Sequence, residues 1–311
     1  MYSAPSSSTR RPSGVSNRPG ATSTIRDYAT TIDHANEILG AKVLRKIGPP
    51  EIAELNAHLR GRMSDSTRAK HLRVLGALFE SAIVHGFAGA NPVRRLPVAE
   101  RPRPQRREAA YYEDEELPRL FAAVDDETMA ALCKTALGTG MRFGELAALR
   151  WGDVDLAGSV IRVRRSVVRG IVGLPKSHER RDVDLTPELV ELLGAWWGAC
   201  GKPGDETLVF PGDAGGEHLD PSTVARRALY PALKEAGIER MGPTGTERTF
   251  HSFRHTYARI ALEAGCELTW LSRQLGHSSS AFTDQRYGHW ARAARKRQVE
   301  RLAGAFAHVG A

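Results

Sequence analysis

The sequence of 311 residues has few cysteines and no long apolar segment. Its three cysteines, Cys133, Cys200 and Cys266, are widely spaced and form no CxxC pair, which argues against a disulfide framework or a zinc knuckle. No apolar run approaches the roughly 20 residues that a transmembrane helix needs. The segment MYSAPSSSTRRPSG at the N-terminus lacks the apolar stretch of a secretory signal. We therefore expect a cytoplasmic protein that makes no membrane contact.

The motifs of several common enzyme classes are also missing. There is no His-Glu-x-x-His spacing and no accompanying carboxylate cluster, which speaks against metal-dependent hydrolysis. No Gly-rich loop followed by Lys-Ser or Lys-Thr provides a place for nucleotide hydrolysis, and no GxSxG elbow is present. We expect neither a cofactor nor a metal.

What the sequence has in excess is positive charge, with a net charge of +8 and a pI near 9.6. Such a balance favours a polyanionic partner, although solvated charged faces explain many basic proteins equally well. Two clusters stand out, in the segments RPRPQRR and RAARKR. They contain Arg101, Arg103, Arg106 and Arg107, and Arg292, Arg295, Lys296 and Arg297.

Composition and hydrophobic periodicity divide the chain into five parts. We predict a flexible basic tail over 1–21, a compact helical unit over 22–98, a basic linker over 99–110, a larger second unit over 111–305 and a C-terminal tail over 306–311. The linker prediction rests on two prolines, which rule out a continuous helix, and on four arginines that are costly to bury. Such a linker is suited either to follow a DNA backbone or to act as a solubilising spacer.

One segment of the first unit, SDSTRAKHLRVLGALFESAIVHGF, has strong helical periodicity. The apolar stripe consists of Leu72, Leu75, Leu78, Phe79 and Ile83. Ser64 to Ser66 offer N-caps and Gly86 ends the helix. Its basic residues, Arg68, Lys70 and Arg73, are candidates for contacts with phosphates or base edges.

The second unit is predicted to be mainly helical with a small antiparallel β-sheet inserted. Helices are expected over 113–124, 127–140, 186–198, 221–237, 251–265 and 267–276. One strand is expected over 159–168, and two more within 170–185 around Gly-Pro turns.

Four segments of this second unit carry candidate functional groups. In GTGMRFGE, Arg142 follows a Gly-x-Gly break and precedes Glu145. In GLPKSHERR, Lys176 lies at a predicted hairpin tip. Each of these residues, taken alone, is more often simply exposed to solvent.

The other two segments are HSFRHTYARIALEAG and LGHSSSAFTDQRYGH. His251 and Arg254 are three residues apart, so a helix places them on one face. An apolar face is expected to contain Phe253, Tyr257, Ile260 and Ala264. The last segment contains His277 and Tyr287, a tyrosine whose neighbours Arg286 and Gly288 favour an exposed position.

Together these residues suit phosphoryl chemistry without a metal. Guanidinium forks hold two phosphate oxygens while charge develops on phosphorus. A tyrosine hydroxyl is able to attack phosphorus, and lysine or histidine to move protons.

The boxes GTGMRFGE, GLPKSHERR, HSFRH and LGHSSSAFTDQRYGH, in this order, resemble the signature of the tyrosine recombinases, or phage integrase family. The resemblance covers about residues 22–305. It implies that family's two-domain plan, with a helical, SAM-like core-binding domain and a catalytic integrase domain. It also implies an enzyme that cleaves and rejoins DNA.

Carried over to this sequence, the resemblance implies that Tyr287 is the nucleophile of a 3′-phosphotyrosyl intermediate. Arg142 and Arg254 match the arginines that hold the scissile phosphate, and Glu145 matches the acidic residue that supports the first of them. Lys176 matches the lysine that protonates the leaving oxygen. His251 matches the histidine that assists proton transfer, and His277 matches a ligand of the phosphate.

The resemblance further implies double-stranded DNA core sites, integration or excision of a phage or mobile element, and an accessory directionality factor. It implies a homo-tetramer joined through a C-terminal helix, for which Val299, Leu302 and Phe306 have helical spacing. Two alternatives stay open. One is a type IB topoisomerase, and the other is a catalytically silent DNA-binding regulator on the same fold.

Overall fold

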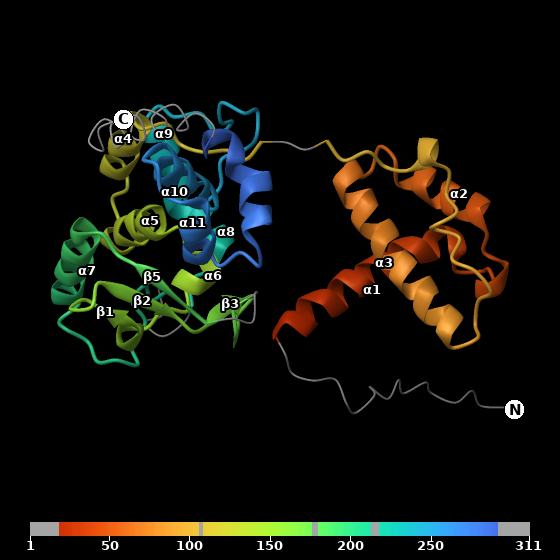
Figure 1. The fold of residues 1–311 in the computed structure, drawn as a ribbon, viewed down its shortest axis with the longest axis horizontal. Coiled ribbons are helices and arrows are strands. Elements are labelled where there is room, and N and C mark those ends of the chain that lie inside the picture. The colour runs from red at the N-terminus through yellow and green to blue at the C-terminus, as the bar shows by residue number, and fades with distance from the viewer. Residues whose placement is uncertain (1–18, 106–107, 176–179, 213–217, 292–311) are drawn as a thin grey trace, which may run out of the picture. The chain divides into compact units, whose positions relative to one another are not determined.

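The computed structural model describes residues 19–105, 108–175, 180–212 and 218–291 (Figure 1). Backbone contacts divide the chain into two units, 1–106 and 107–311, and the division falls within the basic stretch 99–110. Each unit has a hydrophobic core of its own. No helix in the described part of the chain is long and apolar enough to cross a membrane.

The first unit contains helices α1 (Pro19–Leu39), α2 (Pro49–Leu59) and α3 (Asp65–Val84), with 3₁₀ turns at Leu44–Lys46 and Val98–Glu100. The predicted start and end of α3 are confirmed. The Ser64 side chain accepts a hydrogen bond from the Thr67 N–H, and the chain leaves the helix through Gly86 at φ 75°.

The apolar stripe of α3 forms part of this unit's core. Leu72, Leu75 and Phe79 are buried against residues of α1 and α2 such as Leu39 and Leu55. Leu78 and Ile83, the other members of the predicted stripe, are only half-buried. Burial of this stripe stabilises the unit by about 1.5–3 kcal/mol for each large side chain that is fully removed from water.

The second unit is mainly helical, as predicted. Its helices are α4 (Glu116–Ala122), α5 (Glu127–Thr139), α6 (Phe143–Leu146), α7 (Pro187–Ala199), α8 (Pro221–Val224), α9 (Tyr230–Glu235), α10 (Ser252–Glu263) and α11 (Leu268–Leu275), with a 3₁₀ turn at Trp151–Asp153. Residues 280–291 are helical as well. Helices α5 and α10 pack side by side in the centre of this unit (Figure 1).

The strands form two small antiparallel sheets. Strands β1 (Val154–Asp155), β2 (Val160–Val163) and β5 (Arg181–Asp184) pair in the order β1-β2-β5. Strands β3 (Ser166–Val168) and β4 (Ile171–Gly173) form a separate hairpin. Its turn residues, Arg169 and Gly170, both have positive φ, as the twist of a two-residue hairpin requires.

The prediction of one strand over 159–168 is therefore wrong. The strand breaks at Arg164 and Arg165, which both form ion pairs with the buried carboxylate of Asp153, at 3.8 and 2.5 Å. Successive side chains of a regular strand point to opposite faces. Two neighbours that reach one carboxylate must leave that geometry.

The predicted helix over 221–237 is also interrupted. Between α8 and α9 the backbone widens into a π-helical turn at Ala225–Leu229. Pro231 follows in the first turn of α9, and it lacks the N–H that a continuous α-helix requires. The π turn accommodates this missing donor.

Candidate active site

Arg142 lies at the junction between α5 and α6. Gly140 ends α5 with φ 61°, and a Cβ there would lie 2.5 Å from the ring of Tyr257, so this position requires glycine. The guanidinium of Arg142 donates to Glu145 Oε1 at 2.9 Å and to the Gly276 carbonyl at 3.0 Å. A quarter of its side chain remains exposed, so its guanidinium is accessible to a ligand.

Arg254 is anchored by backbone carbonyls and a histidine. It lies on α10 and is only 2% exposed. Its Nη1 donates to the Gly140 carbonyl at 2.7 Å, and its Nη2 donates to the Leu275 carbonyl at 2.6 Å and to His277 Nε2 at 2.9 Å. Burial, together with the charge of Arg142, lowers the pKa of Arg254 to about 9, which leaves it a cation at neutral pH.

Glu145 is the buried anion of this cluster, with an exposure of 1%. Arg181, at the start of β5, donates to both of its carboxylate oxygens, at 3.0 and 2.7 Å. Burial opposes ionisation, but the bonds and charges of Arg181 and Arg142 outweigh it and lower the pKa of Glu145 to about 2. The one carboxylate of Glu145 thus binds the guanidiniums of Arg142 and Arg181, and that of Arg254 lies near it. Positive charge is therefore in excess at this cluster.

Arg181 was not predicted as a site residue. It belongs to the quoted box GLPKSHERR, but sequence does not show that the arginine side chain turns inward. In the structure its Nε donates to the Gln274 carbonyl at 2.9 Å, which ties β5 to α11. The segment RDVDL contains one signal of this orientation. Alternate residues of a strand share a face, so Arg181 points to the same side as the apolar Val183, toward the interior.

His277 follows α11 after Gly276, whose φ is 62°. The ring accepts a hydrogen bond from Arg254 at Nε2, so its Nδ1 carries the proton and donates to Thr283 Oγ1 at 2.7 Å. Burial and the charges of Arg254 and Arg142 lower the pKa of His277 to about 3. The imidazole is therefore neutral at pH 7.

His251 precedes α10 and keeps a solvent-exposed edge. Desolvation by its dense surroundings and the charges of Arg254, Arg286 and Arg142 lower its pKa to about 4. His251 is thus a neutral proton acceptor at neutral pH.

The expected exposure of Tyr287 is wrong, because its side chain is only 1% exposed. Its ring stacks on that of Trp290, at 5.5 Å between centroids and 11° between planes, and lies 6.2 Å from that of His277. Its hydroxyl is 2.7 Å from His255 Nδ1. Burial raises the pKa of Tyr287, and the charges of Arg254 and Arg286 oppose this rise.

The predicted apolar face of α10 needs a correction too. Phe253 is fully buried, but Ile260 is 38% exposed and Ala264 is exposed. Arg254 and His255 are buried instead. The charged and polar side chains of this helix thus face the interior, where the site lies.

The predicted DNA-binding residues of α3 have three different environments. Arg68 is only 4% exposed and donates to Asn56 Oδ1 at 2.7 Å and Asp65 Oδ1 at 2.6 Å. Its predicted role in DNA binding is therefore corrected, because a buried and neutralised guanidinium does not reach a phosphate. Lys70 forms an exposed ion pair with Asp27. Arg73 is exposed and has no ion pair or hydrogen bond within the described residues.

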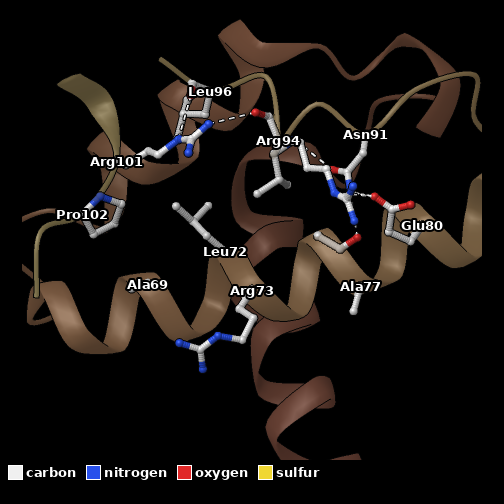
Figure 2. A pocket seen from close by; sticks show the side chains of 12 residues that line it. Ala69, Leu72, Arg73, Ala77, Glu80, Asn91, Arg94, Leu96, Arg101 and Pro102 are labelled. Carbon is white, nitrogen blue, oxygen red and sulfur yellow. Dashed lines mark hydrogen bonds and ion pairs between the residues drawn. The ribbon is translucent and has the colours of Figure 1, made fainter. Parts of the chain in front are cut away.

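Arg73 also lines a pocket of about 900 Å³ in the first unit. Arg101 donates there to the carbonyls of Leu96 and Arg94, both at 2.9 Å, while Arg94 pairs with Glu80 at 2.8 Å. Figure 2 draws these bonds and shows none from Arg73 to the other side chains of the pocket. Arg103, nearby in sequence, has an exposed side chain.

Several predicted residues lie outside the described parts of the chain. They are Lys176, Arg106, Arg107, Arg292, Arg295, Lys296, Arg297, Val299, Leu302 and Phe306. The structure brings together the five other predicted catalytic residues and Glu145 around α10, α11 and the junction of α5 with α6. Their side chains form a positively charged cluster with two neutral histidines and a buried tyrosine.

Residues 111–293 match the model of the phage integrase family. The chain belongs to this family, and it is a site-specific tyrosine recombinase, an enzyme that cleaves and rejoins DNA. A relative from Mycobacterium tuberculosis strain H37Rv that bears the name prophage phiRv2 integrase is 29% identical over 314 residues. That match covers 93% of this chain and 80% of the relative.

Two solved structures share the fold of the chain. The Tn1549 transposon integrase in complex with transposon right end DNA has a TM-score of 0.76 at 20% identity, over 93% of this chain and 95% of that one. A lambda integrase tetramer bound to a Holliday junction has a TM-score of 0.66 at 19% identity, over 86% and 73% of the two chains. The predicted fold, a helical core-binding unit and a mainly helical catalytic unit with a small antiparallel sheet, is confirmed.

Proposed function

We propose that the chain breaks one DNA strand by attack of the Tyr287 hydroxyl on a phosphodiester. The bond from the phenolic oxygen to phosphorus forms, the bond from phosphorus to the 5′ oxygen breaks, and a 3′-phosphotyrosyl intermediate remains. Because the ester bond energy is kept in this intermediate, a 5′-hydroxyl rejoins the strand without ATP. Repetition on a partner duplex exchanges strands, which integrates or excises a phage or mobile element.

The convergence of Arg142 and Arg254 on the loop at residues 275–277 carries this proposal. Both guanidiniums donate to carbonyls of that loop, at Gly276 and Leu275. Carbonyls fix the guanidiniums without cancelling their charge, and the buried carboxylate of Glu145 is shared by Arg142 and Arg181. Such a preorganised excess of positive charge suits a phosphate whose charge increases in the transition state.

The histidines have distinct proposed roles. His251, neutral at pH 7, accepts the phenolic proton, while Lys176 protonates the 5′ oxygen as it leaves. His277 binds a phosphate oxygen, for which its hydrogen bond from Arg254 must open and its proton must move to Nε2. The hydroxyl of Thr283 permits this change, since it is able to donate to Nδ1 as well as accept from it.

The test of the nucleophile is the variant Tyr287→Phe on a nicked suicide substrate, from which the cleaved end is lost. The wild-type chain is expected to form a covalent protein–DNA adduct that survives denaturing electrophoresis, and the variant none. Gel-shift assays provide the control, because Tyr287→Phe should bind DNA with unchanged affinity. An adduct of normal yield in the variant would contradict the assignment.

The DNA core site is proposed to be held by both units and the linker. In the first unit we assign contacts to Arg73, Lys70, Arg101 and Arg103, and in the linker to Arg106 and Arg107. Arg73 is the best supported, since it has no competing partner within the described residues. Lys70 and Arg101 must exchange existing bonds for bonds to phosphate.

For assembly we propose a homo-tetramer on paired sites in the cytoplasm, with an accessory factor setting the direction of the reaction. The lambda integrase tetramer on a Holliday junction supports this proposal by its similar fold. Truncation after Arg297 removes Val299, Leu302 and Phe306. It should leave binding to one site intact and abolish the synaptic complex in native gels.

A further inference from the structure

One buried group at the site has no role in the proposal above, namely His255. It follows Arg254 on α10 and is 5% exposed. Its Nδ1 is 2.7 Å from the Tyr287 hydroxyl, which the guanidiniums of Arg254 and Arg286 also approach. The atom that His255 contacts is thus the one that must attack phosphorus.

The surroundings keep His255 neutral. Burial, and the nearby charges of His251, Arg286 and Arg254, lower the pKa of His255 to about 2. The centroids of the His255 and His251 rings are 4.7 Å apart. Among the described residues, no carboxylate lies within hydrogen-bond distance of either ring nitrogen of His255. His255 is therefore a poor proton acceptor at neutral pH.

The second ring nitrogen decides the tautomer. Arg286 Nη2 lies 3.4 Å from His255 Nε2, and a guanidinium only donates. A proton on Nε2 would point at a cation, so the proton of the neutral ring belongs on Nδ1. His277 follows the same rule, with Arg254 at its Nε2 and the Nδ1 proton directed to the Thr283 hydroxyl.

We propose that His255 donates its Nδ1–H to the Tyr287 oxygen, holds it in position and stabilises the negative charge that develops as the phenolic proton leaves. This inference rests on the proposed function of Tyr287. In the attack, the phenolic proton passes to His251, the phenolic oxygen bonds to phosphorus, and the departing 5′ oxygen takes up a proton from Lys176. His255 keeps its own proton throughout.

The test compares three variants with matched geometry. The amide of His255→Asn reaches the position of Nδ1 and is able to donate, that of His255→Gln reaches Nε2 instead, and His255→Leu donates nothing. We expect single-turnover adduct formation to fall about 10- to 100-fold in the Leu and Gln variants and about threefold or less in the Asn variant. DNA affinity in gel shifts should not change.

A chemical rescue separates this role from simple packing. Tyr287→3,5-difluorotyrosine has a more acidic phenol, which depends less on a hydrogen-bond donor. Introduced into His255→Leu, it should raise the cleavage rate by a much larger factor than the same fluorination does in a chain that keeps His255. Should the Leu variant fail to fold, the same rescue in His255→Gln decides.

Two results would overturn the inference. One is a His255→Leu or His255→Gln variant that cleaves as fast as the wild type or faster. The other is a slow variant that fluorination does not rescue. In both cases Tyr287→Phe would still form no adduct, so failure of this inference differs visibly from failure of the proposed function.

Discussion

Arg68 on α3 and Arg254 on α10 are both buried, and these two arginines are held in opposite ways. Arg68 on α3 forms an ion pair with Asp65 and a bond to the Asn56 amide, so its charge is neutralised locally. Arg254 on α10 is held by two carbonyls and a neutral histidine, and it has no carboxylate partner within the described residues. A buried cation without a counterion is costly, and a bound phosphate relieves that cost.

The largest expected effect is the loss of DNA cleavage rate in the variant Arg254→Ala. Loss of this guanidinium should slow single-turnover adduct formation by about 10² to 10⁴, equivalent to several kcal/mol of transition-state stabilisation. Arg142→Ala should behave similarly. Arg68→Ala is the matched control: it should lose about 1–3 kcal/mol of unfolding free energy through the broken bond to Asn56 but keep the rate of the chemical step. Equal losses in the rate of adduct formation in Arg68→Ala and Arg254→Ala would contradict this difference between a neutralised and a catalytic arginine.

A second prediction concerns Glu145 and pH. Its pKa is about 2 in the folded chain and 4.5 ordinarily, so ionised Glu145 stabilises the fold fully above pH 4.5. That contribution is lost as pH falls through the folded pKa toward 2. Replacement by Glu145→Gln should lower the melting temperature at pH 7, with a loss on the order of 3 kcal/mol in unfolding free energy, because Arg142 and Arg181 lose their shared anion.

The measurement is a series of thermal melts between pH 7 and pH 3 for both proteins. The two melting temperatures should approach each other as the pH falls, since acid removes from the wild type what the variant already lacks. A difference that stays constant over this range would show that ionisation of Glu145 is not the cause.

The smallest expected effect is that of Arg73→Gln on DNA binding. If Arg73 neutralises one phosphate, its loss should weaken binding a few-fold and reduce the slope of log K against log salt by about one. Arg68→Gln should leave the slope unchanged, because that side chain is buried and already paired. Filter-binding titrations at several salt concentrations measure both slopes.

Much of the fold was predictable from local chemistry. The caps of α3 and the glycine at the end of α5 depend on neighbours within a few residues, and the structure has them where the sequence predicted. The error at 159–168 arose from Arg164 and Arg165, whose partner Asp153 lies more than ten positions away. Strand periodicity contains no information about that partner.

The candidate site was predictable only in part. The boxes around Arg142, Arg254, His277 and Tyr287 are ordered motifs, so the sequence identifies them without coordinates. Arg181 was missed because its partner Glu145 lies 36 residues earlier, on α6. His255 was missed because a histidine inside a helix has no distinctive local pattern.

By itself the sequence determined the helical periodicity, the glycine breaks, the excess of positive charge and the order of the four boxes. These properties depend on residue types and short spacings. Only the tertiary structure decided that Tyr287 is buried, that Arg68 is neutralised while Arg254 is not, and that His255 meets the phenolic oxygen. Whether a side chain is buried, and whether its charge is neutralised, depends on which residues from distant parts of the sequence lie next to it. The packing of helices and strands determines those neighbours.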